Sequence, residues 1–247
     1  MTERDTIICA DTEELSRKAA ERFIRLANDA IVRSGRFIVA LSGGSTPRAL
    51  YSLLASPDYN ERIPWNKVHL YWGDERCVPP HHPDSNFLMV QETLLANITI
   101  PRENFHRIAA ELDPKVAAAD YEEQVRKLFE LTPGALPRFD LILLGLGEDG
   151  HTASLFPENE ALNEAHHLVV ATYVEKLNAH RVTLTLPVIN RAAEIVFLVA
   201  GQDKSAVIKL ILGELPEGIN LPAARIRPAN GRLVWLVTKD AASELLQ

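Results

Sequence analysis

The chain has 247 residues, of which 47% are hydrophobic and 24% are charged, and its formal net charge is -7 at pH 7. An acidic chain has no overall attraction to DNA, RNA or anionic membranes, so we expect no nucleic-acid partner and no membrane partner. The length and the apolar share fit one large α/β domain over residues 1–247. Because the net charge is negative, an anionic ligand would need a local basic pocket.

The cysteine content and the lack of a recognisable targeting signal further restrict the class of protein. The two cysteines, Cys9 and Cys77, lack metal-ligand spacing and are too few for a disulfide scaffold. The N-terminal residues lack the basic region and apolar core of a signal peptide, and no apolar run approaches the length of a membrane span. These features favour a cytoplasmic enzyme, whose oligomeric state stays open between a monomer and a small homo-oligomer.

The first elements in chain order are a short strand over residues 6–10 and a long amphipathic helix. Asp11 is the expected N-cap of that helix, which runs to about Arg33 and ends at Gly35. The apolar run Phe37–Leu41 then indicates a second strand that is buried.

Residues 42–47 read SGGSTP and connect this strand to the next helix, for which Thr46 is a candidate cap and Pro47 a candidate first residue. A strand, a glycine-rich turn and a helix point backbone N–H groups at an anion. The segment lacks the lysine of a P-loop and the spacing of a dinucleotide fingerprint. It therefore predicts a site for a single phosphate, and the alternative is a tight turn whose small residues serve packing.

A third strand, Val68–Trp72, leads into the acidic pair and arginine of the segment 73–76, GDER. Such a group at a strand end is either a surface salt-bridge cluster or part of a site. The loop that follows contains His81 and His82, which we interpret as exposed residues rather than metal ligands because no ligand spacing supports a built site.

Two capped helices separate this loop from the centre of the chain. Asp84 or Ser85 is the expected cap of the first helix. A short strand over residues 105–108 follows. Asp113 then caps the second helix, with Pro114 in its first turn.

The central strand is the continuous apolar run Leu141–Leu144, which is typical of a strand buried on both faces. Gly145, Gly147 and Gly150 follow, and His151 comes just past the end of the strand. Ligands bind at that edge of open α/β sheets, and a histidine there can exchange a proton near neutral pH. The alternative is a turn whose histidine only caps backbone groups.

The remaining strands are expected at residues 168–171, 181–186, 195–200, 222–226 and 233–237. Strands that alternate with helices predict a doubly wound, mostly parallel sheet with helices on both faces. In such a sheet the segments 42–47, 74–76 and 145–151 and Lys204 project to one edge, whereas the place of Arg181 stays open. This set suits proton transfer or hydrolysis on a small phosphorylated metabolite, with no cofactor and no metal.

Six sequence segments, which together span nearly the whole chain, bear on the function: SGGSTP, GDER, HPDSN, GLGEDGHTASLFP, RVTLTLP and VAGQDKS. In this order and spacing they resemble the 6-phosphogluconolactonase family, which shares a superfamily with glucosamine-6-phosphate deaminases. The deaminase pattern resembles GHIAFNEP, whose glutamate works with the histidine. This chain has Phe156 at that place and so keeps the lactonase pattern.

The resemblance implies hydrolysis of 6-phospho-D-glucono-1,5-lactone to 6-phospho-D-gluconate in the oxidative pentose phosphate pathway. It implies that His151 is the general base and that Arg76 stabilises the carbonyl oxygen or binds the phosphate. Asp149 either orients the imidazole or only forms the turn. The expected substrate-binding residues are Gly43, Gly44, Ser45, Asp74, Asn86, Arg181 and Lys204, although Asn86 is nearly as well explained as a helix cap. The alternatives are an amino-sugar-phosphate deaminase or isomerase, and a non-catalytic sugar-phosphate sensor.

Overall fold

The computed structural model describes residues 4–213 and 220–246, which are built around a seven-stranded sheet. In spatial order its strands are β1 (Arg4–Cys9), β10 (Arg232–Thr238), β9 (Glu194–Val199), β6 (Leu141–Leu144), β2 (Phe37–Leu41), β3 (Val68–Trp72) and β5 (Phe105–His106). All neighbouring pairs are parallel. Every residue of β2, β6 and β9 is buried, and apart from Glu194 at the start of β9 all of them are apolar, as expected for strands covered on both faces.

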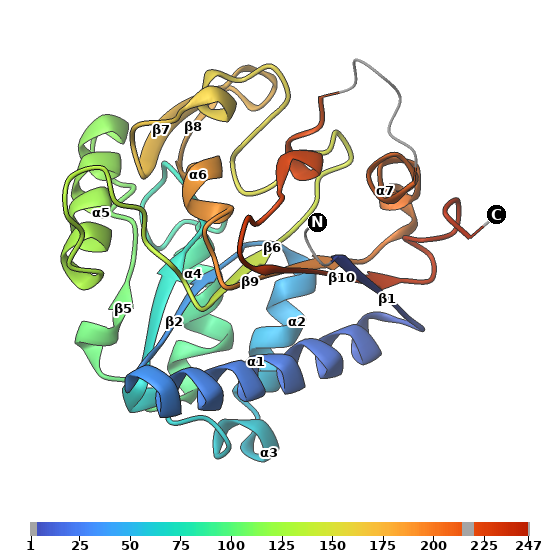
Figure 1. Ribbon diagram of the computed structural model, residues 1–247, viewed down its shortest axis with the longest axis horizontal. Helices are drawn as coiled ribbons and strands as arrows, with labels where there is room; N and C mark the ends of the chain where they lie inside the picture. Colours follow the sequence, from blue (N-terminus) through green and yellow to red (C-terminus); the bar gives the residue numbers. More distant parts are fainter. Residues whose placement is uncertain (1–3, 214–219, 247) are drawn as a thin grey trace.

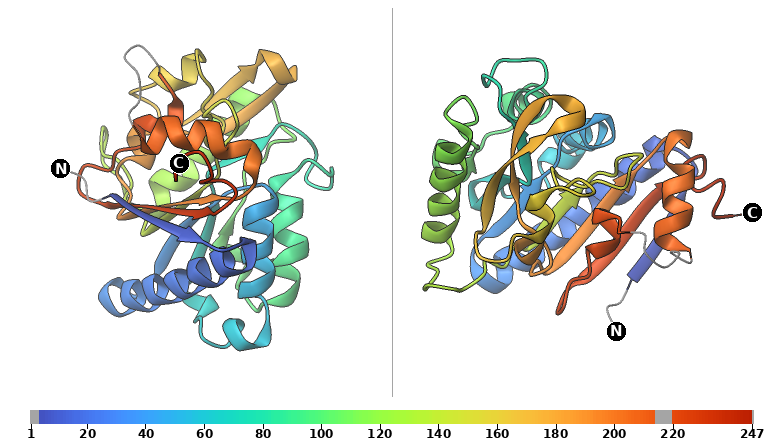
Figure 2. Two further views of the ribbon diagram at one scale, coloured as in Figure 1. Left: turned by 90° about the vertical axis from the view of Figure 1, so that its right-hand side faces the viewer. Right: turned by 90° about the horizontal axis from the view of Figure 1, so that it is seen from above.

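Helices cover both faces of this sheet (Figures 1 and 2). Helices α1 (Thr12–Ser34) and α2 (Ser45–Leu54) lie on one face, and α7 (Ser205–Leu212) lies on the other. The prediction of a doubly wound parallel sheet in an α/β fold is therefore confirmed. The other α-helices are α3 (Pro57–Asn60), α4 (Asn86–Thr93), α5 (Pro114–Leu128) and α6 (Leu186–Ile189).

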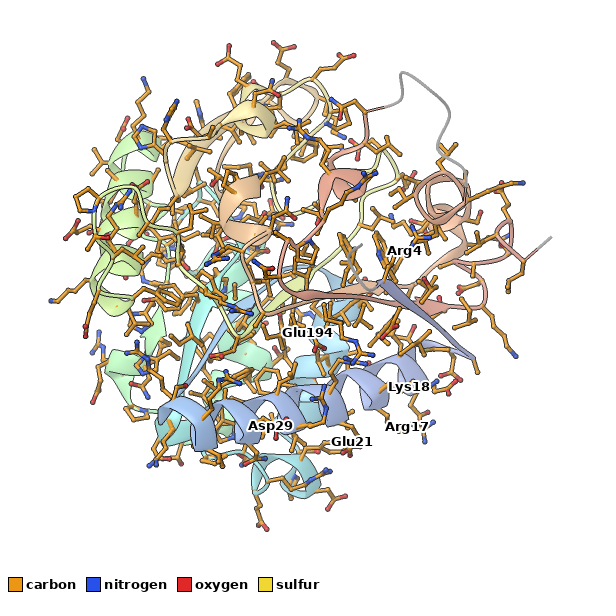
Figure 3. The ribbon with its side chains drawn as sticks, in the orientation of Figure 1. Arg4, Arg17, Lys18, Glu21, Asp29 and Glu194 are labelled. Atoms are coloured by element: carbon orange, nitrogen blue, oxygen red, sulfur yellow. The ribbon has the colours of Figure 1, made fainter. Side chains whose placement is uncertain are left out.

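Helix α1 begins and ends as its sequence predicts. The side chain of Asp11 accepts a hydrogen bond from the N–H of Glu14 at 2.9 Å, and Gly35 ends the helix with φ 77°. Glu194, at the start of β9, forms an ion pair with Arg22 of α1, and Figure 3 shows Glu194 between the sheet and the helix. This buried pair fixes α1 against the sheet. None of the helices in the described residues combines the length and apolar character needed to span a membrane.

A second, antiparallel sheet was not predicted. It consists of β4 (Asp74–Arg76), β8 (Ala179–Leu184) and β7 (Val169–Val174). The expected strands over residues 168–171 and 181–186 are β7 and β8, so neither belongs to the main sheet. Gly73 joins the two sheets, because its N–H donates to Leu41 O at 2.8 Å and its carbonyl accepts from the N–H of Leu184 at 2.9 Å.

The expected strand over residues 222–226 is also wrong. The segment is a 3-10 helix, η7 (Pro222–Arg225). Proline has no N–H to give to a strand ladder, and the N–H of Ala223 donates instead to the carbonyl of Gly150 at 3.0 Å. This contact holds η7 against the turn that follows β6. The expected strand over residues 105–108 is shorter than predicted, since β5 ends at His106.

The order of the strands creates a crevice in the middle of the sheet. From β2 the chain moves to β3 and β5 on one side, whereas from β6 it moves to β9 and β10 on the other side. The direction of winding therefore reverses between β2 and β6, which are neighbours. Segments that leave the carboxyl ends of two such strands diverge, and the space between them is where ligands bind in this class of sheet.

Candidate active site

A cavity of about 650 Å³ opens at the carboxyl ends of β2, β6 and β9. It brings together nine of the ten residues predicted from the sequence: Gly43, Gly44, Ser45, Asp74, Arg76, Asn86, His151, Arg181 and Lys204. The tenth, Asp149, does not line the cavity, but its carboxylate contacts Nδ1 of His151. The cavity therefore includes Arg181, whose position the sequence left open.

The imidazole of His151 is held on two sides. Its Nδ1 lies 2.5 Å from Oδ1 of Asp149, and the ring of Phe156 stacks on it with centroids 4.1 Å apart. Because an ionised carboxylate only accepts hydrogen bonds, we assign the ring hydrogen to Nδ1, which leaves a lone pair on Nε2. Gly147 makes room for this arrangement, since a Cβ there would lie 1.9 Å from Nδ1.

The surroundings of His151 keep its imidazole neutral. Burial lowers the pKa of His151 to about 4, and the charges of Arg181, Lys204 and Arg76 act in the same direction, whereas Asp74 opposes them. A neutral imidazole at pH 7 can accept a proton. The carboxylate that binds Nδ1 would then stabilise the imidazolium that forms. This arrangement suits a general base.

Two arginines lie side by side in the second sheet, and both line the cavity. Arg76 of β4 and Arg181 of β8 are direct cross-strand partners, and like charges in that position destabilise a sheet. Burial and the neighbouring Arg76 lower the pKa of Arg181. In the described part of the chain neither buried Nε atom has a hydrogen-bond partner. An anion between the two side chains would remove the repulsion and supply acceptors.

The glycine loop presents the start of α2 to the same cavity. Gly44 is the N-cap, with φ 107°, and among the described residues no side chain caps this end. The helix begins at Ser45, so the prediction that Thr46 caps it is wrong, and Pro47 is the third helical residue rather than the first. Pro47 has no N–H and the N–H of Arg48 donates to the carbonyl of Gly44, so the N–H groups of Ser45 and Thr46 are the ones that this helix start offers to an anion.

Asp74 and Asn86 are fixed by a buried polar network. Oδ2 of Asp74 accepts from Oγ of Ser154 at 2.7 Å, and Nδ2 of Asn86 donates to the carbonyl of Asp74 at 3.0 Å. Glu75 points away from the cavity and accepts from the N–H groups of Asn86 and Phe87 at 2.8 and 2.7 Å. Glu75 thus holds the start of α4 in place.

Asn86 is not the cap of α4, because Ser85 performs that function by accepting from the N–H of Leu88 at 3.2 Å. The side chain of Asn86 packs against the glycine loop instead, since a Cβ on Gly43 would lie 1.9 Å from its Oδ1. This contact places the amide of Asn86 directly beside the loop. The prediction that either Asp84 or Ser85 caps the helix is confirmed for Ser85.

The last basic residue of the cavity is Lys204, in the turn after β9. It forms ion pairs with Asp203 at 2.7 Å and with Glu148 at 3.7 Å. His81 and His82 lie in the loop after β4 and do not line this cavity. Within residues 4–213 and 220–246, no cluster of three or more His, Cys, Asp or Glu side chains could hold a metal ion.

Two residues near the site were not predicted. Ser154 binds Asp74, and Lys176 forms an ion pair with Oδ2 of Asp149. Lys176 comes from the turn between β7 and β8, far from Asp149 in the sequence. Its only signal was its position in a polar segment, which does not indicate a partner.

The chain is similar to known proteins over nearly its whole length. The family profile described as "Glucosamine-6-phosphate isomerases/6-phosphogluconolactonase" matches residues 10–235. A protein of Nostoc sp. named 6-phosphogluconolactonase is 39% identical over 239 residues, covering 96% of this chain and 97% of the relative. A Synechocystis sp. protein of the same name is 43% identical over 217 residues, covering 87% and 88%. The structure "6-phosphogluconolactonase from Trypanosoma cruzi" has a TM-score of 0.87 and 28% identity, covering 100% of this chain and 99% of that one. The chain therefore belongs to the glucosamine-6-phosphate isomerase/6-phosphogluconolactonase family.

Proposed function

We propose that this protein hydrolyses 6-phospho-D-glucono-1,5-lactone to 6-phospho-D-gluconate, with His151 as the general base. One observation carries the proposal: the imidazole of His151, with Nδ1 bound by Asp149, lines the same cavity as two cross-strand arginines and a helix start that no described side chain caps. The relatives named 6-phosphogluconolactonase support the same activity. A single hydrophobic cluster that includes residues of both sheets supports one domain over residues 1–247.

The proposed reaction uses a single general base, which accepts a proton from water in the first step and gives it to the leaving ring oxygen in the second. Nε2 of His151 accepts a proton from water while the water oxygen attacks the lactone carbonyl. The carboxylate of Asp149 stabilises the imidazolium. When the bond between the carbonyl carbon and the ring oxygen breaks, the imidazolium protonates that oxygen, which leaves as a hydroxyl group. The product acid then loses its proton to solvent.

The remaining residues are assigned to binding and charge stabilisation. The backbone at Gly43, Gly44 and Ser45, together with Arg181 and Lys204, holds the phosphate. Arg76 donates to the carbonyl oxygen as negative charge develops there. Asp74 and Asn86 bind sugar hydroxyls. The closeness of Arg76 and Arg181 supports a substrate that places its phosphate and its carbonyl near one another.

The assignment of the two arginines has its own test. Arg181→Met should mainly raise KM, because ground state and transition state both carry the phosphate. Arg76→Met should mainly lower kcat, because the oxyanion exists only in the transition state. The opposite pattern would exchange the two assignments and leave the reaction unchanged.

The deaminase alternative is disfavoured by one contact. Phe156 stacks on His151 at the place where the deaminase pattern has a glutamate. A phenyl ring cannot exchange a proton, so the pair of groups that the deaminase pattern implies is incomplete in this chain. A cytoplasmic location, the lack of nucleic-acid binding and a monomeric or small homo-oligomeric state stay predictions.

The experiment uses freshly generated lactone and a coupled 6-phosphogluconate dehydrogenase. We expect the wild-type enzyme to exceed the spontaneous rate, and His151→Ala to lose about 10²–10⁴ in kcat. His82→Ala is the matched control, since that histidine lies outside the cavity. Full activity of His151→Ala would refute the mechanism. Ammonia release from glucosamine 6-phosphate, without lactone hydrolysis, would refute the function, and binding without turnover would favour a sensor.

A further inference from the structure

Lys176 contacts both of the groups that hold the imidazole of His151. It lies in the 3-10 turn η5 (Glu175–Leu177) at the tip of the hairpin formed by β7 and β8. Its Nζ pairs with Oδ2 of Asp149 and lies 4.7 Å from the centroid of the Phe156 ring. Asp149 binds Nδ1 of the imidazole and Phe156 stacks on its face. One cation therefore touches both supports of the proposed base.

We propose that Lys176 is a positioning residue, which fixes Asp149 and Phe156 and thereby holds His151 in place for catalysis. This inference rests on the proposed function and adds to it a residue from a different element of the fold. By occupying Oδ2, Lys176 leaves Oδ1 of the carboxylate aimed at Nδ1. The same cation also offsets part of the carboxylate charge, which favours the neutral form of the imidazole.

The hairpin tip is anchored well enough to act in this way. The side chain of Asn159 donates to the carbonyl of Tyr173 at 2.9 Å, which joins the hairpin to the segment just after Phe156. The hydroxyl of Tyr173 forms a hydrogen bond with the side chain of Asn178, whose φ of 47° closes the turn. Lys176 is thus held next to Phe156 by contacts that do not involve its own charge.

Stability alone does not explain this ion pair. The side chain of Lys176 is 50% exposed, and pairs of that exposure contribute little to folding. Its effect should therefore appear in His151 rather than in the melting temperature. The other charged groups that influence or contact His151 are Asp74, Arg76, Asp149, Arg181 and Lys204. The variants of Lys176 leave all five of these residues in place.

The test compares Lys176→Met, which keeps the apolar stem over Phe156, with Lys176→Arg, which keeps the charge. The imidazole of His151 is titrated by NMR in the free enzyme, and kcat and KM are measured by quenching the remaining lactone with hydroxylamine. In Lys176→Met the pKa of His151 should rise by about 0.5–1 pH unit, because the carboxylate acts with its full charge. Its kcat should fall roughly 10-fold with an unchanged KM, since the base is less well oriented. Lys176→Arg and the neighbouring control Glu175→Gln should match the wild type.

A double-mutant cycle separates a positioning effect from a general one. In the Asp149→Asn background, Lys176→Met should cause no further change in the titration of His151. Two results would overturn the inference: an unchanged titration and kcat in Lys176→Met, or an equal shift with and without Asp149. The NMR arm needs no turnover, so it still tests Lys176 if the wild-type enzyme proves inactive on the lactone, which would refute only the proposed function.

Discussion

A single methyl group at Gly147 should remove most of the activity and leave ligand binding intact. In Gly147→Ala the new Cβ would lie 1.9 Å from Nδ1 and 2.1 Å from Cε1 of His151, and 2.8 Å from Oδ1 of Asp149. Non-bonded carbon atoms need about 3.5–4 Å. The imidazole must therefore rotate away, and its hydrogen bond to Asp149 must break.

The size of the effect follows from the function of the displaced group. Loss of a positioned general base costs about 10²–10⁴ in rate, or about 3–5 kcal/mol of transition-state stabilisation. Overpacking costs about 1–3 kcal/mol of folding free energy, which is less than the about 5–15 kcal/mol of a typical domain, so the variant should fold. The three atoms nearest to the new Cβ belong to His151 and Asp149 and not to the arginine pair or the glycine loop, so the Kd for 6-phosphogluconate should change less than about threefold.

The assay measures kcat with fresh lactone, Kd for 6-phosphogluconate by calorimetry, and the melting temperature. Gly145→Ala is the matched control in the same loop, because no described atom lies within 4 Å of its Cβ. That variant should keep most of the activity. A Gly147→Ala enzyme with more than about a tenth of the wild-type kcat would refute the argument. Equal losses in both variants would show that the loop tolerates no methyl group, whatever His151 does.

Three further predictions concern protons and charge. Because the pKa of His151 is lowered to about 4, kcat/KM should stay flat from about pH 7 down to pH 5 and fall only as pH approaches 4; a half-loss near pH 6.5 would contradict the assignment. Burial lowers the pKa of His106 to about 4 and also lowers that of His69, so the unfolded chain binds more protons below pH 6.5. Urea unfolding should therefore show stability falling from pH 6.5 towards pH 4, with a shallower slope in His106→Phe, and equal slopes would be contrary evidence. Arg181→Met should leave the ligand-free protein as stable as the wild type or more so, by up to about 1 kcal/mol, while abolishing the rise in melting temperature with 6-phosphogluconate; a less stable variant would make Arg181 structural.

The sequence predicted the main sheet and the edge at which the site lies because those signals are local. The runs that became β2 and β6 are apolar throughout, which is typical of strands buried on both faces. The caps at Asp11 and Ser85 each use a side chain and an N–H three residues away. Strand identity then placed the glycine loop and His151 at the same edge without knowledge of any long-range contact.

The rest of the site depends on pairings that leave no local pattern. The alternation of RVTLTL indicates a strand but not its partner, and the strand pairs with β4 rather than with the main sheet. Arg181 therefore reached the site through an unpredicted sheet. The ion pair between Lys176 and Asp149 joins two segments that are far apart in the sequence, and no local pattern indicates that they meet. At Pro222 a β-like run became a helical turn because the neighbouring N–H was used by Gly150.

The second sheet explains why the cavity can hold its cations so close together. Side chains opposite one another in an antiparallel pair are fixed within a few ångströms, so β4 and β8 hold Arg76 and Arg181 at a distance that two flexible loops would not maintain. The cost of that repulsion is reduced by Asp74, Glu75 and Asp84, whose charges favour the ionised form of Arg181. Neither buried Nε has a partner among the described residues, so the pair is incomplete as it stands. Arg76 donates to the carbonyl of Asp84, but its charge still faces that of Arg181 across the two strands. The cost of this arrangement is best explained by the proposed ligand, whose phosphate would bind Arg181 and whose carbonyl oxygen would bind Arg76, and the neutral His151 lines the same cavity.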